Sequence, residues 1–155
     1  MQPKSCFLIG HRDAPMNIFP HLLDAVETHI TKYAVSEFVV GHYGNFDHLA
    51  ARVLITAKHS HPEITLTLLL PYHPAERPIE IPTGFDNTYY PFGAERVPRK
   101  LAIARANQYM VEHVDHLIAY AWQPASNATK LVRYAERISL TSELTVFNIA
   151  NKIVL

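Results

Sequence analysis

The residues of this sequence whose types and spacing most clearly indicate a function are those that could bind an anion. Arg12 follows a short apolar run and carries a guanidinium whose fork of donors matches a phosphate or a carboxylate. Ser126, Asn127 and Thr129 follow another apolar run and can open a helix, whose free backbone N–H groups also attract an anion. The sequence therefore predicts a ligand site more clearly than it predicts a reaction.

Glycines accompany these polar residues in the expected turns. Gly10, Gly41 and Gly44 each leave room for a ligand to approach the main-chain N–H groups. Asp47 comes shortly after Gly44 and has two possible roles, which the sequence leaves open. It could accept a hydrogen bond from a ribose hydroxyl, or it could cap the following helix and favour its positive end.

Two ring side chains lie next to the same turns. His11 could act as a general base because its usual pKa is near neutrality, but no partner carboxylate is identifiable and a structural role is the alternative. Trp122 is the only tryptophan and directly follows an apolar run. A nucleobase could stack on it, or it could fill the core.

The elements that must position these residues alternate along the chain. Apolar, β-branched runs predict strands at 6–9, 37–40, 64–70, 117–121 and 144–149, and helical periodicity predicts helices at 17–34, 46–59, 99–114 and 129–139. This alternation predicts an α/β fold, a three-layer α/β/α Rossmann-like sandwich with a mostly parallel sheet. We expect the strand order 3-2-1-4-5, which brings the turns at residues 10–12 and 126 to face each other across one crevice.

The segment from 71 to 98 interrupts this pattern. It contains six prolines and excludes long regular elements, although residues 88–90 could form a short strand. Irregular segments of this length are often binding loops or lids, and a surface connector is the alternative.

Composition limits the classes of partner. With 155 residues the chain has the length of one domain, 1–155, and its 14 basic residues balance 14 acidic ones. This balance argues against nucleic acid as a partner. No apolar run is long enough to span a membrane. Because no export signal is visible either, we expect a cytoplasmic protein. We expect no metal site, because the ten histidines lack zinc-site spacing. Self-association into a homo-oligomer is compatible with this architecture.

Several motifs together resemble one known superfamily. They are Ile9-Gly10-His11-Arg12, the stretch from Gly41 to Asp47, the block Asn107-Gln108-Tyr109-Met110-Val111 before the fourth strand, and Ser126-Asn127-Ala128-Thr129. The combination resembles the SLOG superfamily, which joins the DNA-processing protein DprA to the lysine-decarboxylase-like LOG enzymes, and in particular its YpsA-like branch. The resemblance spans nearly the whole chain. It implies a Rossmann-like sheet with a site for a nucleotide or a nucleotide derivative.

The resemblance also indicates what is missing. LOG enzymes hydrolyse the bond between base and phosphoribose and carry a Pro-Gly-Gly-x-Gly-Thr-x-x-Glu signature. Here Pro-Gly-Gly is absent, and Val132 stands at the position of the catalytic glutamate. Without that carboxylate, the group expected to assist departure of the base is lost.

Three functions follow from these observations. The leading one is binding of a nucleotide or nucleotide-derived small molecule by Arg12, the three glycines, Asp47 and the 126–129 block. The protein would act as a sensor or carrier, with no catalysis assigned. The cofactor or ligand is not identified beyond this class. The second is a LOG-like hydrolase or transferase acting on a nucleoside phosphate, with His11 or Asp47 as acid or base. The third is DprA-like binding of single-stranded DNA.

Overall fold

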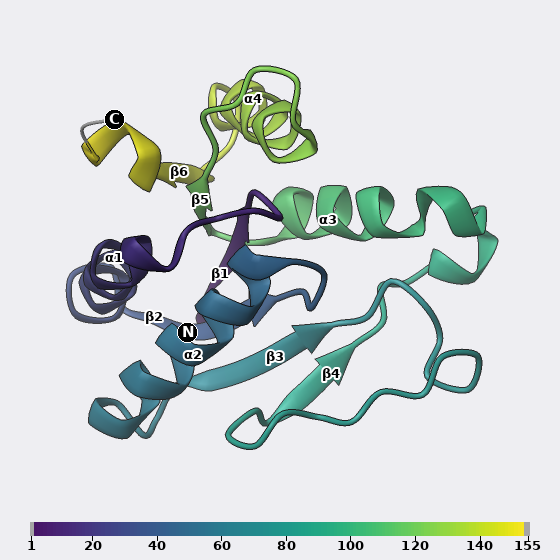
Figure 1. The fold of residues 1–155 in the computed structure, drawn as a ribbon, viewed down its shortest axis with the longest axis horizontal. Helices are drawn as coiled ribbons and strands as arrows, with labels where there is room; N and C mark the ends of the chain where they lie inside the picture. Colours follow the sequence, from purple (N-terminus) through teal and green to yellow (C-terminus); the bar gives the residue numbers. More distant parts are fainter. Residues whose placement is uncertain (1, 154–155) are drawn as a thin grey trace.

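A computed structural model describes residues 2–153 of the chain (Figure 1). Its centre is a six-stranded sheet in the order β4-β3-β2-β1-β5-β6, in which every neighbouring pair is parallel. The strands are β1 (Lys4–Gly10), β2 (Val35–Val40), β3 (Thr65–Leu69), β4 (Asn87–Tyr89), β5 (His116–Tyr120) and β6 (Thr145–Asn148). The predicted α/β fold is confirmed. The five predicted strands keep their predicted order, and the sheet differs in detail because β4 adds a sixth strand at one edge.

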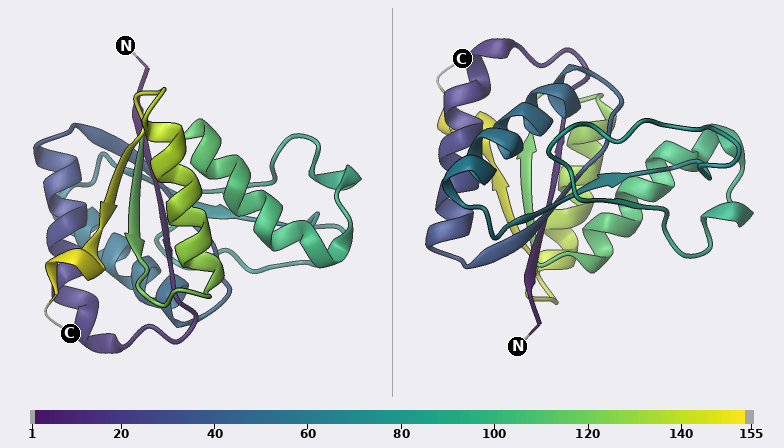
Figure 2. Two further views of the ribbon diagram at one scale, coloured as in Figure 1. Left: turned by 90° about the horizontal axis from the view of Figure 1, so that it is seen from above. Right: turned by 90° about the horizontal axis from the view of Figure 1, so that it is seen from below.

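Helices cover both faces of the sheet (Figures 1 and 2). They are α1 (Phe19–Thr31), α2 (Asn45–Ser60), α3 (Ala102–His113) and α4 (Asn127–Ser139), with short 3-10 turns at Met16–Ile18, Ala94–Arg96, Arg99–Leu101 and Ile149–Lys152. The apolar sides of α1 and α2 pack in one core cluster, and those of α3 and α4 pack in another. The expected three-layer arrangement is therefore present.

The side chains of strand β1 alternate between the two core clusters. Successive side chains of a strand point to opposite faces of the sheet. Cys6 and Leu8 accordingly pack with α1 and α2, whereas Phe7 and Ile9 pack with α3 and α4. Both faces are buried, so β1 contains a nearly continuous apolar run, as central parallel strands do.

The proline-rich segment leaves the compact part of the molecule and returns through α3 (Figure 2). Within it, β4 pairs with β3, and Asp86 anchors this edge. The Asp86 carboxylate accepts a hydrogen bond from the Leu66 N–H at 2.8 Å and forms an ion pair with Lys58 at 2.5 Å. Pro98 is the N-cap of a 3-10 turn at Arg99–Leu101, and regular α-helix follows only from Ala102. Helix α3 therefore begins later than the predicted start at residue 99.

The start of α2 also differs from the prediction. Capping of this helix was one of the two roles left open for Asp47, but the N-cap residue is Gly44, with φ of 124° and no side-chain cap. Within residues 2–153, no helix combines the length and the apolarity that a membrane crossing requires.

Candidate functional site

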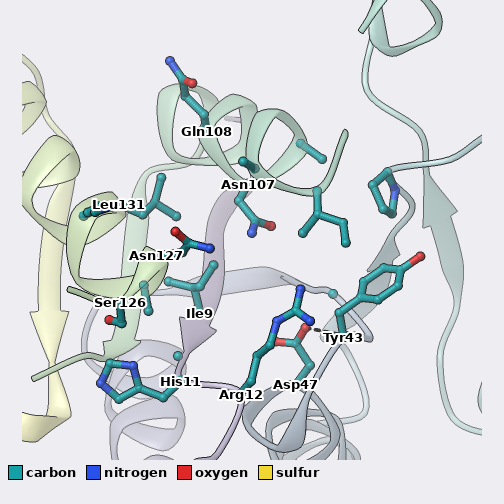
Figure 3. A pocket seen from close by; sticks show the side chains of 18 of the residues that line it. Ile9, His11, Arg12, Tyr43, Asp47, Asn107, Gln108, Ser126, Asn127 and Leu131 are labelled. Carbon is teal, nitrogen blue, oxygen red and sulfur yellow. Dashed lines mark hydrogen bonds between the residues drawn. The ribbon is translucent and has the colours of Figure 1, made fainter. Parts of the chain in front are cut away.

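A pocket of about 860 Å³ lies at the carboxyl ends of the central strands (Figure 3). It is bordered by the loops after β1, β2 and β5, by the N-terminal half of α3 and by the first turns of α4. Of the predicted site residues, those that line the pocket are Gly10, His11, Arg12, Gly41, Asp47, Ser126 and Asn127. Gly44, Trp122 and Thr129 do not belong to this lining. The fold thus brings together the turns after β1 and β5, as the expected strand order requires.

Arg12 reaches the pocket from the loop after β1. Its backbone carbonyl accepts the Asn45 N–H at 2.8 Å, which ties this loop to the start of α2. The side chain is exposed, and in Figure 3 its guanidinium lies beside the carboxylate of Asp47. A fixed backbone and a solvent-accessible guanidinium are the conditions under which arginine can bind an incoming anion.

Asp47 lies beneath Arg12 at the start of α2. Its carboxylate accepts a hydrogen bond from the backbone N–H of Tyr43 at 2.9 Å, so it closes the turn after β2 (Figure 3). Burial raises the pKa of Asp47 to about 6, against the opposing effects of the Tyr43 hydrogen bond and of the positive charges of His48 and Arg12. At neutral pH the group is mostly ionised, and it contributes a negative charge to the pocket.

His11 is buried and holds two loops together. Its Nε2 accepts hydrogen bonds from the backbone N–H groups of Trp122 at 2.9 Å and Gln123 at 3.3 Å. Its Nδ1 is buried and has no hydrogen-bond partner among the residues described. Burial lowers the pKa of His11, which keeps the ring neutral as its acceptor role requires. The basic nitrogen is thus already engaged by the backbone, and the geometry supports the structural alternative over a general base.

The first turn of α4 is capped as predicted. The Ser126 hydroxyl accepts the Thr129 N–H at 3.1 Å and donates to, or accepts from, the Thr129 hydroxyl at 2.9 Å. Thr129 is therefore used inside the cap, while Ser126, Asn127 and Ala128 border the pocket. The positive end of the helix dipole is directed toward the same space as Arg12.

Trp122 lies at the edge of this assembly. Its side chain is 47% exposed, its indole N–H donates to the Tyr120 hydroxyl at 3.1 Å, and its ring meets that of His11 edge-on. It neither fills the core nor lines the pocket.

Packing within the chain accounts for the glycines. A Cβ at Gly10 would lie 2.4 Å from the Phe46 ring, and one at Gly41 would lie 2.8 Å from the Asp47 carboxylate. Gly44 has a positive φ, and a Cβ there would lie 2.9 Å from the Arg12 Cα. The glycines let α2 approach β1 closely, which positions Arg12 and Asp47 at the pocket floor.

Sequence reasoning missed other residues of the pocket. Lys100 and Lys130 add two cations, and Tyr43 and Asn107 add polar side chains. Asn107 belongs to the motif that precedes the fourth predicted strand, so a signal for it existed. No local pattern marked the two lysines, because only the packing of α3 and α4 brings them to one pocket. Within residues 2–153, no group of histidine, cysteine and carboxylate side chains is arranged to hold a metal ion.

Comparison with known proteins adds one finding. No family model matches the chain, and neither does any curated protein sequence. The fold resembles that of DNA processing protein A. One matching solved structure, from Helicobacter pylori, is described by its single-stranded DNA binding mode. The match has a TM-score of 0.60 and 16% sequence identity, and it covers 97% of this chain and 71% of the other.

This similarity agrees with the SLOG resemblance at the level of the fold. It also corrects the expectation about partners. Balanced total charge argued against nucleic acid, yet a protein of similar fold binds single-stranded DNA. The argument was wrong because total charge ignores distribution. Three cations, Arg12, Lys100 and Lys130, and two carboxylates, Asp13 and Asp47, line one pocket, so cations are in excess there although the net charge of the chain is zero.

Proposed function

We propose that the pocket binds a nucleotide unit, with its phosphate between Arg12 and the N-terminus of α4. The observation that carries this proposal is the convergence of an exposed guanidinium, a capped helix start and two lysines on one pocket of about 860 Å³. This volume lies within the range of small-molecule sites, about 300–1,000 Å³. The chemistry is that of an anion site, in which helix N–H groups and cations act together.

The remaining lining suits the base and the sugar. Ile9 of β1, Ile103 of α3 and Leu131 of α4 give the lining apolar surface. Asn107 contributes an amide that can donate and accept hydrogen bonds (Figure 3). If the occupant is a free nucleotide, Asp47 is our candidate acceptor for a sugar hydroxyl, because its carboxylate can accept hydrogen bonds besides the one from the Tyr43 N–H. An internal nucleotide of a DNA strand has no free sugar hydroxyl, so Asp47 has no such role for that occupant.

The occupant favoured by the comparison is single-stranded DNA. The supporting observation is the similar fold of DNA processing protein A, whose binding of single-stranded DNA is described. A phosphate site with local cations fits one unit of a strand as well as a free nucleotide. We also propose that the chain belongs to the YpsA-like branch of the SLOG superfamily, on the motifs quoted above.

Hydrolysis of a nucleoside phosphate has less support. Val132 occupies the position of the LOG glutamate, and its side chain is buried in the core between α4 and the sheet. The ring nitrogen of His11 that could act as a base is engaged by backbone N–H groups. We therefore propose binding without assigning a reaction.

The test measures binding of a fluorescent single-stranded oligothymidylate at low salt, with competition by thymidine monophosphate. We expect Arg12→Ala to weaken binding about 10- to 100-fold, the effect of losing a charge-assisted contact. Arg133→Ala is the matched control, because Arg133 is exposed on α4 outside the pocket lining and its loss changes the net charge equally. Equal affinities of the two variants would remove Arg12 from the site.

A further inference from the structure

A second hollow, of about 190 Å³, adjoins the main pocket. It lies between α3 and the segment around residues 91–97. The two hollows share three lining residues, Pro71, Ala106 and Gln108. A ligand that extends from the main pocket past α3 therefore reaches the second hollow without leaving the protein surface.

Helix α3 presents a different set of side chains to each hollow. Ile103 and Asn107 line the main pocket, whereas Arg105 and Tyr109 line the second hollow. Arg105 is exposed. Tyr109 is held in place, because the Tyr89 hydroxyl donates to its hydroxyl at 3.1 Å. The second hollow therefore combines an accessible cation with an aromatic side chain held by a hydrogen bond. The carboxylate of Glu112 also lines it and accepts a hydrogen bond from the Tyr134 hydroxyl.

Phe92 projects from the rim of the second hollow and is 88% exposed. It lies at the tip of a tight turn, in which the Ala94 N–H donates to the Pro91 carbonyl at 3.1 Å and Gly93 takes the left-handed conformation with φ of 83°. The turn thus presents the phenyl ring to solvent from an ordered backbone. Phe92 and Arg105 line the same hollow, and bases of single strands stack on exposed aromatic rings in grooves that also carry cations.

We propose that this second hollow binds the next nucleotide of a single strand of DNA, with its base on Phe92 and its phosphate at Arg105. The proposal rests on the proposed function and extends it, because it assigns the occupant of the main pocket to a strand rather than to a free nucleotide. Continuity with the main pocket and the presence of Phe92 and Arg105 in the lining of one hollow favour this occupant. Stacking on an aromatic face accepts every base, so the subsite adds affinity without sequence preference.

The experiment compares two ligands, thymidine monophosphate and a ten-nucleotide oligothymidylate, by calorimetry on the full chain. We expect Phe92→Ala to weaken binding of the oligonucleotide about 5- to 50-fold and to leave the affinity for the mononucleotide unchanged. Leu140→Ala is the matched control, because Leu140 is similarly exposed, at 83%, at the end of α4. Phe92→Tyr should retain oligonucleotide binding, because tyrosine also offers an aromatic face. Arg105→Ala should make the slope of log affinity against log salt concentration shallower by about one, the value for one lost phosphate contact.

The outcomes separate this inference from the proposed function. If wild-type protein binds the mononucleotide but Phe92→Ala binds the oligonucleotide as tightly as Leu140→Ala does, the second subsite is overturned and the proposed function stands. If Phe92→Ala weakens binding of both ligands by the same factor, Phe92 contributes to the structure of the main pocket, and the second subsite is likewise overturned. If the wild-type protein binds neither ligand, the proposed function itself fails and the inference fails with it.

Discussion

The Nε2 atom of His11 accepts the backbone N–H of Trp122 at 2.9 Å, a bond between residues that are 111 positions apart in the chain. A second N–H, from Gln123, reaches the same nitrogen at 3.3 Å. His11 lies in the loop after β1, and both donors lie in the loop after β5. The histidine therefore spans the two neighbouring strands whose loops form the pocket, and it fixes the distance between Arg12 and the start of α4.

Replacing His11 by alanine tests this role. His11→Ala leaves the N–H groups of Trp122 and Gln123 without their acceptor and opens a cavity in the packed loops. We expect the free energy of unfolding to fall by about 2–4 kcal/mol. Urea denaturation measures the change, and His59→Ala, at an exposed position near the end of α2, is the control. A loss no larger than that of the control would contradict the structural role.

The pH dependence of the same variant gives a second prediction. Burial lowers the pKa of His11 in the folded protein, so near pH 6 the unfolded chain binds more protons than the folded one. The contribution of His11 to stability is complete above about pH 6.5, the usual histidine pKa, and is lost as pH falls below it. The destabilisation caused by His11→Ala should therefore be largest at about pH 8 and shrink toward about pH 5. A pH-independent difference in unfolding free energy would show that the ring is not held neutral.

The sequence was sufficient for the order of β3, β2, β1, β5 and β6, because apolar runs long enough to be buried strands alternate with segments of helical periodicity, apart from the proline-rich stretch after β3. It indicated a short strand at residues 88–90, close to the observed β4, but not that this strand would join the sheet beside β3. Asp86 supports this edge through the backbone of β3 and through Lys58. Contacts between residues that are distant in sequence leave no periodic pattern.

The same reason separates the predicted from the unpredicted parts of the pocket. Arg12 and Ser126 follow strand ends, where parallel sheets place ligands, so topology alone indicated them. Lys100 and Lys130 reach the pocket only through the packing of α3 and α4. The role of His11 depended on which backbone N–H groups its ring would meet, which only the folded chain shows.

Gly44 gives a prediction about how the pocket floor is built. Gly44→Ala forces a Cβ to a position 2.9 Å from the Arg12 Cα at a residue whose φ is 124°. We expect a loss of about 1–3 kcal/mol in unfolding free energy and weaker nucleotide binding, because Arg12 must shift. Gly93→Ala is a matched control, since Gly93 also has a positive φ of 83° but nothing lies within 4 Å of its Cβ position. Equal losses of unfolding free energy in both variants would show that backbone strain alone, and no collision with Arg12, destabilises Gly44→Ala.

The charge of Asp47 gives the last prediction. Burial raises its pKa from 3.8 to about 6, so between these values the folded protein binds more protons than the unfolded chain. This group therefore makes the protein more stable as pH falls through about 6, and its ionised form destabilises the fold at neutral pH. Asp47→Asn removes the charge and keeps an oxygen that can accept the Tyr43 N–H. Because Asp47 is only partly buried by surface area, solvent screening reduces the effect.

We expect Asp47→Asn to raise the unfolding free energy by about 1 kcal/mol at about pH 8 and to give no gain near pH 4, where the wild-type carboxyl is protonated. Urea denaturation across this range measures the difference, with Asp24→Asn, at an exposed position of α1, as the control. The same substitution should strengthen phosphate binding at neutral pH, because it removes the negative charge beside Arg12. A stability difference that stays constant with pH would show that the carboxyl titrates in the folded protein as it does in the unfolded chain, and would contradict this prediction.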